Sequence, residues 1–346
     1  MSVEPVGSSP VTLAIVGCGA ITRASHLPSL ARLADFQVKV LCDTNRRNAE
    51  LMRAEFALDC DIATDIPDLT GRVDAAIVAT PPRLHAPIAL QLMQMGIDVM
   101  CEKPLAASAA DAEHMVDVAQ RLNRILAVGL ITRLHPNNEV LLDLLADELL
   151  GEIQHISVEF GGPLDWPMTS DAYFRPATTA GGVLFEAGVH FIDRMAWLFG
   201  DLSDISMWDD SYGGFESNAL MTGFLTVHGR QIPCSTAFSW THQLSNSIRV
   251  TGSRSRAEVR MSDPIHVWVN RQIGGHDRIM SISSGMEKSM RAIDPYRAQL
   301  ADFAVAVKTR RPPFVPGSTA ITALRIIERA YSVRQRISQP WVETAS

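Results

Sequence analysis

The feature that most constrains the fold is a short apolar run that leads directly into a glycine turn. Residues Val11–Val16 are apolar and rich in β-branched side chains, which is typical of a buried parallel strand. The turn Gly17-Cys18-Gly19 follows at once, and a helical stretch then continues to residue 33. Strand, glycine turn and helix in this order are the context that a dinucleotide-binding fingerprint requires.

Each position of this turn has a physical task in a dinucleotide site. Gly17 permits the tight turn, and Gly19 lets the backbone approach a pyrophosphate at the helix N-terminus. The third position is Thr22, where the pattern asks for glycine or alanine, so close packing of helix on strand is less favoured there. The alternative is an ordinary glycine turn. In a dinucleotide site, we expect Gly17, Gly19, Ala20 and Ile21 to contact the cofactor.

An acidic residue, Asp43, follows the second predicted strand, residues 37–42. Its spacing is about that of the carboxylate that binds the ribose 2′-hydroxyl, and a carboxylate there repels a 2′-phosphate, so NAD is expected. Arg46 and Arg47 keep NADP possible, because a nearby arginine serves a 2′-phosphate, and Arg47 is a candidate cofactor contact. Asp43 is also compatible with a simpler role as a cap of the helix predicted over residues 45–56.

Strands and helices alternate through residue 135. This predicts an α/β Rossmann domain over residues 11–135, with a doubly wound parallel sheet. Thr80 and Pro81 end one predicted strand (73–79) and are expected beside the dinucleotide, and we expect His26 and His85 to hold loops near it. The other predicted elements of this half are strands at 62–64, 97–101 and 125–131 and helices at 85–95 and 108–123.

A charged pair stands where a buried strand ends, at Glu102-Lys103-Pro104. Loops at the carboxyl ends of parallel strands carry the chemistry of α/β proteins. Pro104 pushes Lys103 towards an extended conformation and away from any helix. We therefore expect Lys103 to act on substrate and Glu102 to contact the ribose or nicotinamide end of the cofactor.

The composition changes after Arg133, and strand-like segments then recur without crossover helices. This predicts an α+β domain over residues 136–346 with a large, mostly antiparallel, open sheet. Its predicted strands are 153–161, 204–208, 219–228, 232–240, 247–252, 256–261 and 265–270, and its helices are 138–150, 183–199, 295–310 and 318–334. Residues 1–10 are predicted to be a disordered tail without the features of a signal peptide.

Bulk properties exclude several classes of function. A net charge of -7 with no basic stripe argues against nucleic acid, and no apolar run is long enough to cross a membrane. The five cysteines form no CxxC pair, which fits reduced thiols in a cytoplasmic enzyme. A sheet with an exposed face favours a homo-oligomer, either a dimer or a tetramer.

These motifs together resemble the Gfo/Idh/MocA family of sugar and inositol oxidoreductases. The matching motifs span nearly the whole chain in the order of the family: Gly17-Cys-Gly-Ala-Ile with His26-Leu-Pro28, Val73-Asp-Ala-Ala-Ile-Val-Ala-Thr-Pro81 with His85, Cys101-Glu-Lys-Pro104, Gly181-Gly182 with Gly188-Val189-His190 and Asp193, and Tyr296-Arg297 with Asp302-Phe303. The resemblance implies an N-terminal Rossmann domain and a C-terminal domain whose sheet serves substrate binding and oligomer contacts.

The resemblance also implies a hydride exchanged between a nicotinamide and a secondary alcohol or ketone of a sugar, inositol or sugar derivative. The family's lysine and Asp-x-x-x-His positions correspond here to Lys103, Glu186 and His190, with glutamate in place of the commoner aspartate. An imidazole titrates near neutral pH and suits the base, and Glu186, four residues before it, shares its helix face. Lys103 would hold the reacting oxygen. No third ligand is spaced for a metal site.

Further substrate-binding candidates lie at the domain junction and in the long loop after residue 161. They are Arg133, Trp166, Tyr173 and Arg175. Two other functions stay open: a net non-redox reaction in which bound NAD is reduced and reoxidised within one turnover, and a ligand-sensing protein that has lost catalysis. A sensor need not keep both Lys103 and His190. The sequence names neither the sugar nor the direction of reaction.

Overall fold

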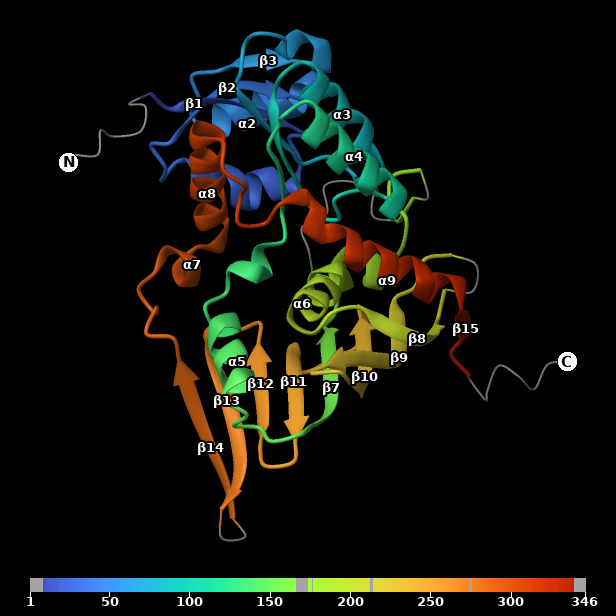
Figure 1. The fold of residues 1–346 in the computed structure, drawn as a ribbon. Helices are drawn as coiled ribbons and strands as arrows, with labels where there is room; N and C mark the ends of the chain where they lie inside the picture. The colour runs from blue at the N-terminus through green and yellow to red at the C-terminus, as the bar shows by residue number, and fades with distance from the viewer. Residues whose placement is uncertain (1–8, 166–173, 176, 212–213, 274–275, 339–346) are drawn as a thin grey trace, which may run out of the picture. The chain divides into compact units, whose positions relative to one another are not determined.

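The computed structural model describes residues 9–165, 174–175, 177–211, 214–273 and 276–338 (Figure 1). The chain forms two compact units. The described residues of the first unit are 9–135, 174–175, 177–180 and 288–321, and those of the second are 136–165, 181–211, 214–273, 276–287 and 322–338. The first unit is left after His135, and the chain returns to it twice. The predicted tail lies mostly outside the described residues.

The first unit contains a six-stranded sheet with the order β3-β2-β1-β4-β5-β6. Its strands are β1 (Val11–Val16), β2 (Phe36–Cys42), β3 (Asp61–Ala63), β4 (Ala75–Val78), β5 (Asp98–Cys101) and β6 (Leu126–Val128). Every neighbouring pair is parallel. The strand order reverses at β1 and β4, and such a switch point is where open α/β sheets bind dinucleotides. The predicted doubly wound sheet is confirmed.

Helices cover both faces of this sheet, as its apolar central strands require. They are α1 (Leu27–Leu30), α2 (Arg46–Glu55), α3 (His85–Gln94), α4 (Ala109–Arg121) and α8 (Pro295–Thr309). α8 comes from a distant part of the sequence, yet its Phe303 is fully buried in one cluster with Leu13 and Ile15 of β1. The Phe303 and Phe36 rings stack with centroids 6.1 Å apart. Helix α8 therefore belongs to the first unit, although it follows most of the second unit in sequence.

The second unit contains a nine-stranded sheet with the order β14-β13-β12-β11-β7-β10-β9-β8-β15. Its strands are β7 (Ile153–Gly161), β8 (Leu202–Asp209), β9 (Asn218–Val227), β10 (Arg230–Ser239), β11 (Ser247–Gly252), β12 (Arg256–Arg260), β13 (Asp263–Ile273), β14 (His276–Ser283) and β15 (Arg334–Arg336). Among the described strands of this second sheet, only the β7–β10 and β8–β15 pairs are parallel. The predicted mostly antiparallel sheet is confirmed. Strand β14 was not predicted, and residue 334, where β15 begins, was predicted to end a helix.

One face of this second sheet packs against helices and the other stays open. Figure 1 shows α5 (Asn137–Ala146), α6 (Val189–Phe199) and α9 (Ile321–Ser332) on the same side of the sheet. Along β9 buried and exposed residues alternate, and the exposed set includes Leu220 and Phe224. This alternation is typical of an antiparallel sheet with a single packed face. The short helix α7 (Met290–Ile293) belongs to the first unit.

Candidate active site

The glycine turn after β1 has a geometry that only glycine meets at its first position. Gly17 has φ of +100°, and its N–H donates to Cys42 O at 2.8 Å. A Cβ at Gly17 would lie 2.5 Å from the carbonyl oxygen of Ala79, on the loop after β4. A Cβ at Gly19 would have no atom within 4 Å. The fold therefore requires glycine at position 17, whereas position 19 borders open space.

Thr22 does not loosen the turn, contrary to the expectation from its departure from the pattern. Its side chain is fully buried, and its Oγ1 donates to Gly17 O at 2.7 Å. Thr22 begins a π-helical segment, Thr22–His26, that continues into α1. Such segments occur often at functional sites. The hydroxyl holds the glycine turn in place of the close contact that glycine or alanine would make.

Asp43 anchors the same turn from the end of β2. Its Oδ2 accepts the Cys18 N–H at 2.8 Å, and its Oδ1 accepts the Asn45 N–H at 2.8 Å. Asn45, not Asp43, is the N-cap of α2. Arg46 pairs with Glu50 at 2.9 Å on the exposed side of α2. The carboxylate of Asp43 is therefore held beside the glycine turn by two backbone N–H groups.

Glu102 is buried beneath the loop that carries Lys103. Its Oε1 lies 2.9 Å from His26 Nε2, and its Oε2 accepts the Lys103 N–H at 3.1 Å. Burial would raise the pKa of the Glu102 carboxyl, but His26 and Lys103 outweigh burial and lower that pKa below its usual value. A Cβ on Gly129, after β6, would lie 2.8 Å from Oε2. The lowered pKa favours the ionised form of Glu102, and these contacts hold its carboxylate in place.

His85 joins two loops at the same edge of the sheet. Its Nδ1 lies 2.7 Å from Pro104 O, and its Nε2 lies 2.7 Å from Thr80 O. The ring is fully buried, and this burial lowers the pKa of the imidazole. Lys103, half-buried, precedes Pro104 through a cis peptide bond. His85 therefore links the lysine loop to the loop that follows β4.

These residues fit a dinucleotide at the carboxyl edge of β1, β4 and β5. Thr80 Oγ1 is buried and has no hydrogen-bond partner in the part of the chain that the structure describes. A ribose or amide group would satisfy this hydroxyl, and the open space at Gly19 admits a pyrophosphate. Pro81 precedes a 3-10 turn, Pro82–Leu84. Ala20 and Ile21 open the helix, and Arg47 lies exposed on α2.

Glu186 and His190 lie on one helical stretch of the second unit. Glu186 belongs to a π-helical segment, Leu184–Gly188, and His190 is the second residue of α6. Glu186 is buried and His190 is half-buried. A Cβ on Gly188 would lie 3.1 Å from the ring of Phe238, so this stretch packs closely on β10. Residues four apart share a helix face, which places the carboxyl and imidazole groups on one side.

The remaining predicted substrate contacts have different positions. Arg133 is buried in the 3-10 turn Ile131–Leu134, and its Nη2 donates to Thr319 O at 3.2 Å. Arg175 is exposed, and residues just after it are tied to the loop of Thr80, because Arg83 N and Nε donate to Thr178 O and Thr179 O at 3.1 and 2.8 Å. Trp166 and Tyr173 lie outside the described residues.

The thiols and acidic groups of the described residues were examined as metal ligands and nucleophiles. All five cysteines are free, and burial raises the pKa of Cys18 to about 12 and that of Cys42 to about 11. Such thiols stay protonated and unreactive at neutral pH. Across the described residues, no three His, Cys, Asp or Glu side chains gather as metal ligands. Nor does any described helix combine the length and apolarity needed to cross a membrane.

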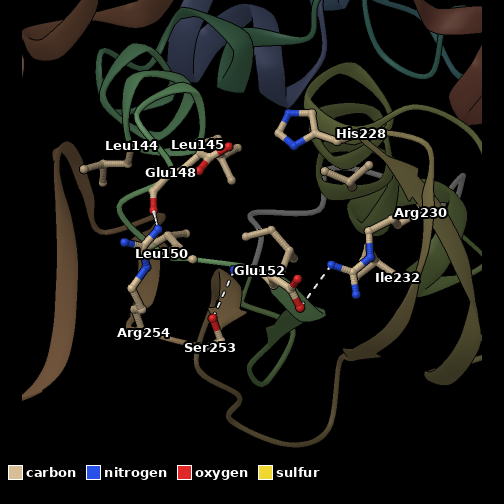
Figure 2. Close-up of a pocket in the computed structure, with 13 residues that line it drawn as sticks. Leu144, Leu145, Glu148, Leu150, Glu152, His228, Arg230, Ile232, Ser253 and Arg254 are labelled. Atoms are coloured by element: carbon tan, nitrogen blue, oxygen red, sulfur yellow. Dashed lines mark hydrogen bonds and ion pairs between the residues drawn. The ribbon is translucent and has the colours of Figure 1, made fainter.

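A cavity of about 430 Å³ in the second unit does not coincide with the predicted chemistry (Figure 2). It lies between the end of α5, the start of β7 and two hairpin turns, and its wall includes Leu150 and Ile232. Its polar groups largely satisfy one another: Arg230 pairs with Glu152 at 3.2 Å, and Arg254 Nη2 donates to Glu148 O at 2.8 Å. None of the predicted site residues lines it.

Most of the chain matches models of a known protein family. Residues 11–130 match the model "Oxidoreductase family, NAD-binding Rossmann fold", and residues 144–343 match "Oxidoreductase family, C-terminal alpha/beta domain". The chain is 26% identical over 266 residues to the dTDP-3,4-didehydro-2,6-dideoxy-alpha-D-glucose 3-reductase of Saccharopolyspora spinosa, covering 75% of this chain and 77% of that one.

Two solved structures share the fold. The 3-ketoreductase from Actinomadura kijaniata, in complex with NADP and TDP-benzene, superposes with a TM-score of 0.80 at 20% identity, over 96% of this chain and 100% of that one. Levoglucosan dehydrogenase, in complex with NADH and levoglucosan, gives 0.80 at 15% identity, over 94% and 97%.

The two-domain match defines the class: this is an NAD(P)-dependent oxidoreductase with a Rossmann domain and a C-terminal α/β domain. The chain belongs to the Gfo/Idh/MocA family. Both the predicted family and the predicted nicotinamide cofactor are confirmed.

Proposed function

We propose that this protein transfers a hydride between NAD(P) and a secondary alcohol or ketone of a sugar or sugar derivative. The observation that carries the proposal is the fixed lysine loop beside the dinucleotide turn. Glu102 and His85 hold the two sides of that loop, and the glycine turn and Thr80 lie along the same sheet edge. The relative from S. spinosa, named as a sugar 3-reductase, supports the substrate class.

Each catalytic residue has one task in this proposal. The bound nicotinamide supplies the hydride acceptor or donor. His190 takes the hydroxyl proton during oxidation and returns it during reduction. The Lys103 ammonium steadies the negative charge that develops on the reacting oxygen. Glu186 orients the imidazole or binds another hydroxyl of the sugar, and Arg133, Trp166, Tyr173 and Arg175 are proposed to bind the remainder of the substrate.

We propose that the cofactor is NAD in preference to NADP. Asp43 is held by two backbone N–H groups beside the glycine turn, and its charge would repel a 2′-phosphate. Arg46, one of the two arginines that keep NADP possible, pairs with Glu50. Arg47 remains the candidate contact for the adenosine end.

We further propose a cytoplasmic homo-oligomer. Five free thiols fit a reducing compartment. The open face of the nine-stranded sheet exposes 44% of Leu220 and 38% of Phe224, side chains that a second copy of the chain would cover.

A substrate panel of sugars, polyols and nucleotide sugars tests the proposal through formation of reduced nicotinamide. Lys103→Ala and His190→Ala should each lower kcat by about 10²-fold or more, the range that a positioned acid–base group contributes. The cofactor Kd should stay nearly unchanged. Glu186→Asp should retain more activity than Glu186→Ala, since the shorter carboxylate keeps the charge.

Two exposed residues of the first unit serve as matched controls: Lys288→Ala and His114→Ala should leave kcat unchanged. Near wild-type turnover in Lys103→Ala or His190→Ala would remove that residue from its catalytic role. No turnover of any sugar by the wild-type protein would favour a sensing function instead.

A further inference from the structure

A buried carboxylate far along the chain binds the start of the helical stretch that carries Glu186 and His190. Glu216 is 1% exposed and lies just before β9. Its two carboxylate oxygens accept the Gly182 N–H at 3.1 Å each, and its Oε1 accepts the Leu184 N–H at 3.0 Å. The backbone joins in, because the Val183 N–H donates to Glu216 O at 2.9 Å.

These contacts replace a cap that the local sequence does not provide. The first N–H groups of a helix have no partner within the helix, and the residue at the N-cap position, Val183, makes no side-chain hydrogen bond. An anion at a helix N-terminus is stabilised by the aligned peptide dipoles. Glu216 supplies both the hydrogen-bond acceptors and the negative charge from 34 residues further along the chain.

Tyr331 of α9 completes the arrangement from a third element. Its hydroxyl donates to Glu216 Oε1 at 2.7 Å. Burial and the neighbouring Glu216 raise the pKa of Tyr331 well above its usual value, so the phenol stays a donor. Burial also raises the pKa of Glu216, and the Tyr331 hydroxyl and the N–H donors oppose that rise.

The paired glycines make room for these two residues. A Cβ on Gly182 would lie 2.0 Å from the backbone oxygen of Glu216, and a Cβ on Gly181 would lie 2.2 Å from Tyr331 Oη. We call Glu216 and Tyr331 together the clamp. Any larger residue at position 181 or 182 would push the clamp away from the start of the helix. In the sequence, Gly181-Gly182 only marks the start of a helix. In the structure, the close contacts of Glu216 and Tyr331 explain why both positions need glycine.

We infer that Glu216 and Tyr331 are positioning residues for the reaction: together they fix the first turn before Glu186 and His190 and so set where those two side chains stand. Neither residue needs to touch the substrate to do this. Glu186 lies only two residues after Leu184, whose N–H is bound, and its own N–H donates to Gly182 O at 2.9 Å. A shift of the clamp is therefore transmitted directly to Glu186. The inference rests on the proposed function, because it assigns these two residues a part in that reaction.

The test compares Glu216→Gln and Tyr331→Phe with Asp201→Asn in the full-length protein. Asp201 is an exposed carboxylate just past the opposite end of α6, where it pairs with Arg329, so it is a matched control. Glu216→Gln keeps the shape of the side chain but places an amide against backbone N–H donors. We expect kcat to fall about tenfold or more, as for the loss of charge-assisted hydrogen bonds worth about 1.4 kcal/mol. The KM for the sugar should change less than kcat.

Two further readouts separate positioning from a general loss of structure. The acidic limb of the pH profile of kcat/KM, which His190 sets in the proposed function, should move in Glu216→Gln and not in Asp201→Asn. Hydrogen exchange of the amides at residues 181–190 should accelerate in Glu216→Gln, while cofactor Kd stays unchanged. Tyr331→Phe, which removes one hydroxyl, should show the same changes to a smaller degree and guards against misfolding of the first variant.

The outcomes distinguish this inference from the proposed function. Unchanged kcat and pH profile in Glu216→Gln, with a strong loss in His190→Ala, would overturn the positioning role and leave the function standing. Unchanged hydrogen exchange would overturn the clamp itself. Full activity of His190→Ala would remove His190 from its catalytic role and overturn the positioning role with it, whatever the exchange data show.

Discussion

Two alanine substitutions in the glycine turn should separate folding from cofactor binding. In Gly17→Ala, the methyl group would lie 2.5 Å from Ala79 O on backbone with φ of +100°. A left-handed conformation costs a non-glycine residue roughly 1–2 kcal/mol, and relief of the overlap costs more because a strand end must move. We expect a loss of at least about 2 kcal/mol in the free energy of unfolding of the cofactor-free protein.

Gly19→Ala should behave in the opposite way. Its methyl group meets no atom within 4 Å and its φ is not left-handed, so the free energy of unfolding should stay within about 0.5 kcal/mol of wild type. The dinucleotide, however, needs that space for its pyrophosphate, and the Kd for NAD should rise about tenfold or more.

Denaturant unfolding without cofactor and fluorescence titration with NAD measure the two effects. Equal destabilisation by both substitutions would refute the distinction between the two glycines. An unchanged Kd in Gly19→Ala would refute the placement of the cofactor at this turn.

Three further predictions address specificity, assembly and pH. The wild-type protein should bind NAD more tightly than NADP, and Asp43→Asn should narrow that difference in a fluorescence titration; equal affinities in the wild type would remove Asp43 from its role. Leu220→Glu should dissociate the oligomer, which light scattering would detect as a lower mass. Leu122→Glu, at a similarly exposed leucine of the first unit, should leave the mass unchanged. An unchanged mass in Leu220→Glu would exclude the open sheet face as the oligomer interface. Because the folded-state pKa of Glu102 is lowered, its contribution to stability is present above the ordinary glutamate pKa and is lost as pH falls through the folded-state pKa. The difference in unfolding free energy between wild type and Glu102→Gln should therefore shrink over that acidic range, and a difference independent of pH would contradict the ionised state of Glu102.

The sequence predicts most of the first unit because its signals are local. Five of the six residues of β1 are apolar and buried. Ser108 and Asn45 cap α4 and α2, as their side chains favour. The place of α8 is not local: Phe303 completes the core beneath β1 from far along the chain. An apolar helix face predicts that the helix will be buried, but it does not predict which sheet the helix packs against.

The second unit shows the same limit. β14 runs along the sheet edge with largely exposed side chains, so its sequence lacks the alternation that marks the central strands. The clamp of Glu216 could not be predicted either, since an isolated glutamate before a strand looks like any exposed one. The evidence for the clamp is the clash that a Cβ at Gly181 or Gly182 would have with Tyr331 or Glu216, and only the three-dimensional structure shows these clashes.

Two of the helical stretches that carry candidate site residues contain a π-helical segment near their start. Thr22–His26 brings His26 to Glu102, and Leu184–Gly188 carries Glu186. Periodicity identifies a helix at each place but does not distinguish a π turn from an α turn. The sequence therefore suggests the candidate residues and the loop-holding roles of His26 and His85, but it does not suggest the contacts of Glu216 and Tyr331.

The most direct test of the proposed reaction follows one hydrogen atom. A sugar that the protein turns over is prepared with deuterium on the carbon that bears the reacting hydroxyl and is incubated with NAD. The proposal predicts that the deuterium appears in the reduced nicotinamide, in amounts equal to the ketone formed, and that Lys103→Ala and His190→Ala suppress this transfer while still binding NAD. Deuterium that remains in the sugar product, with no reduced cofactor accumulating, would contradict it and indicate a net non-redox reaction.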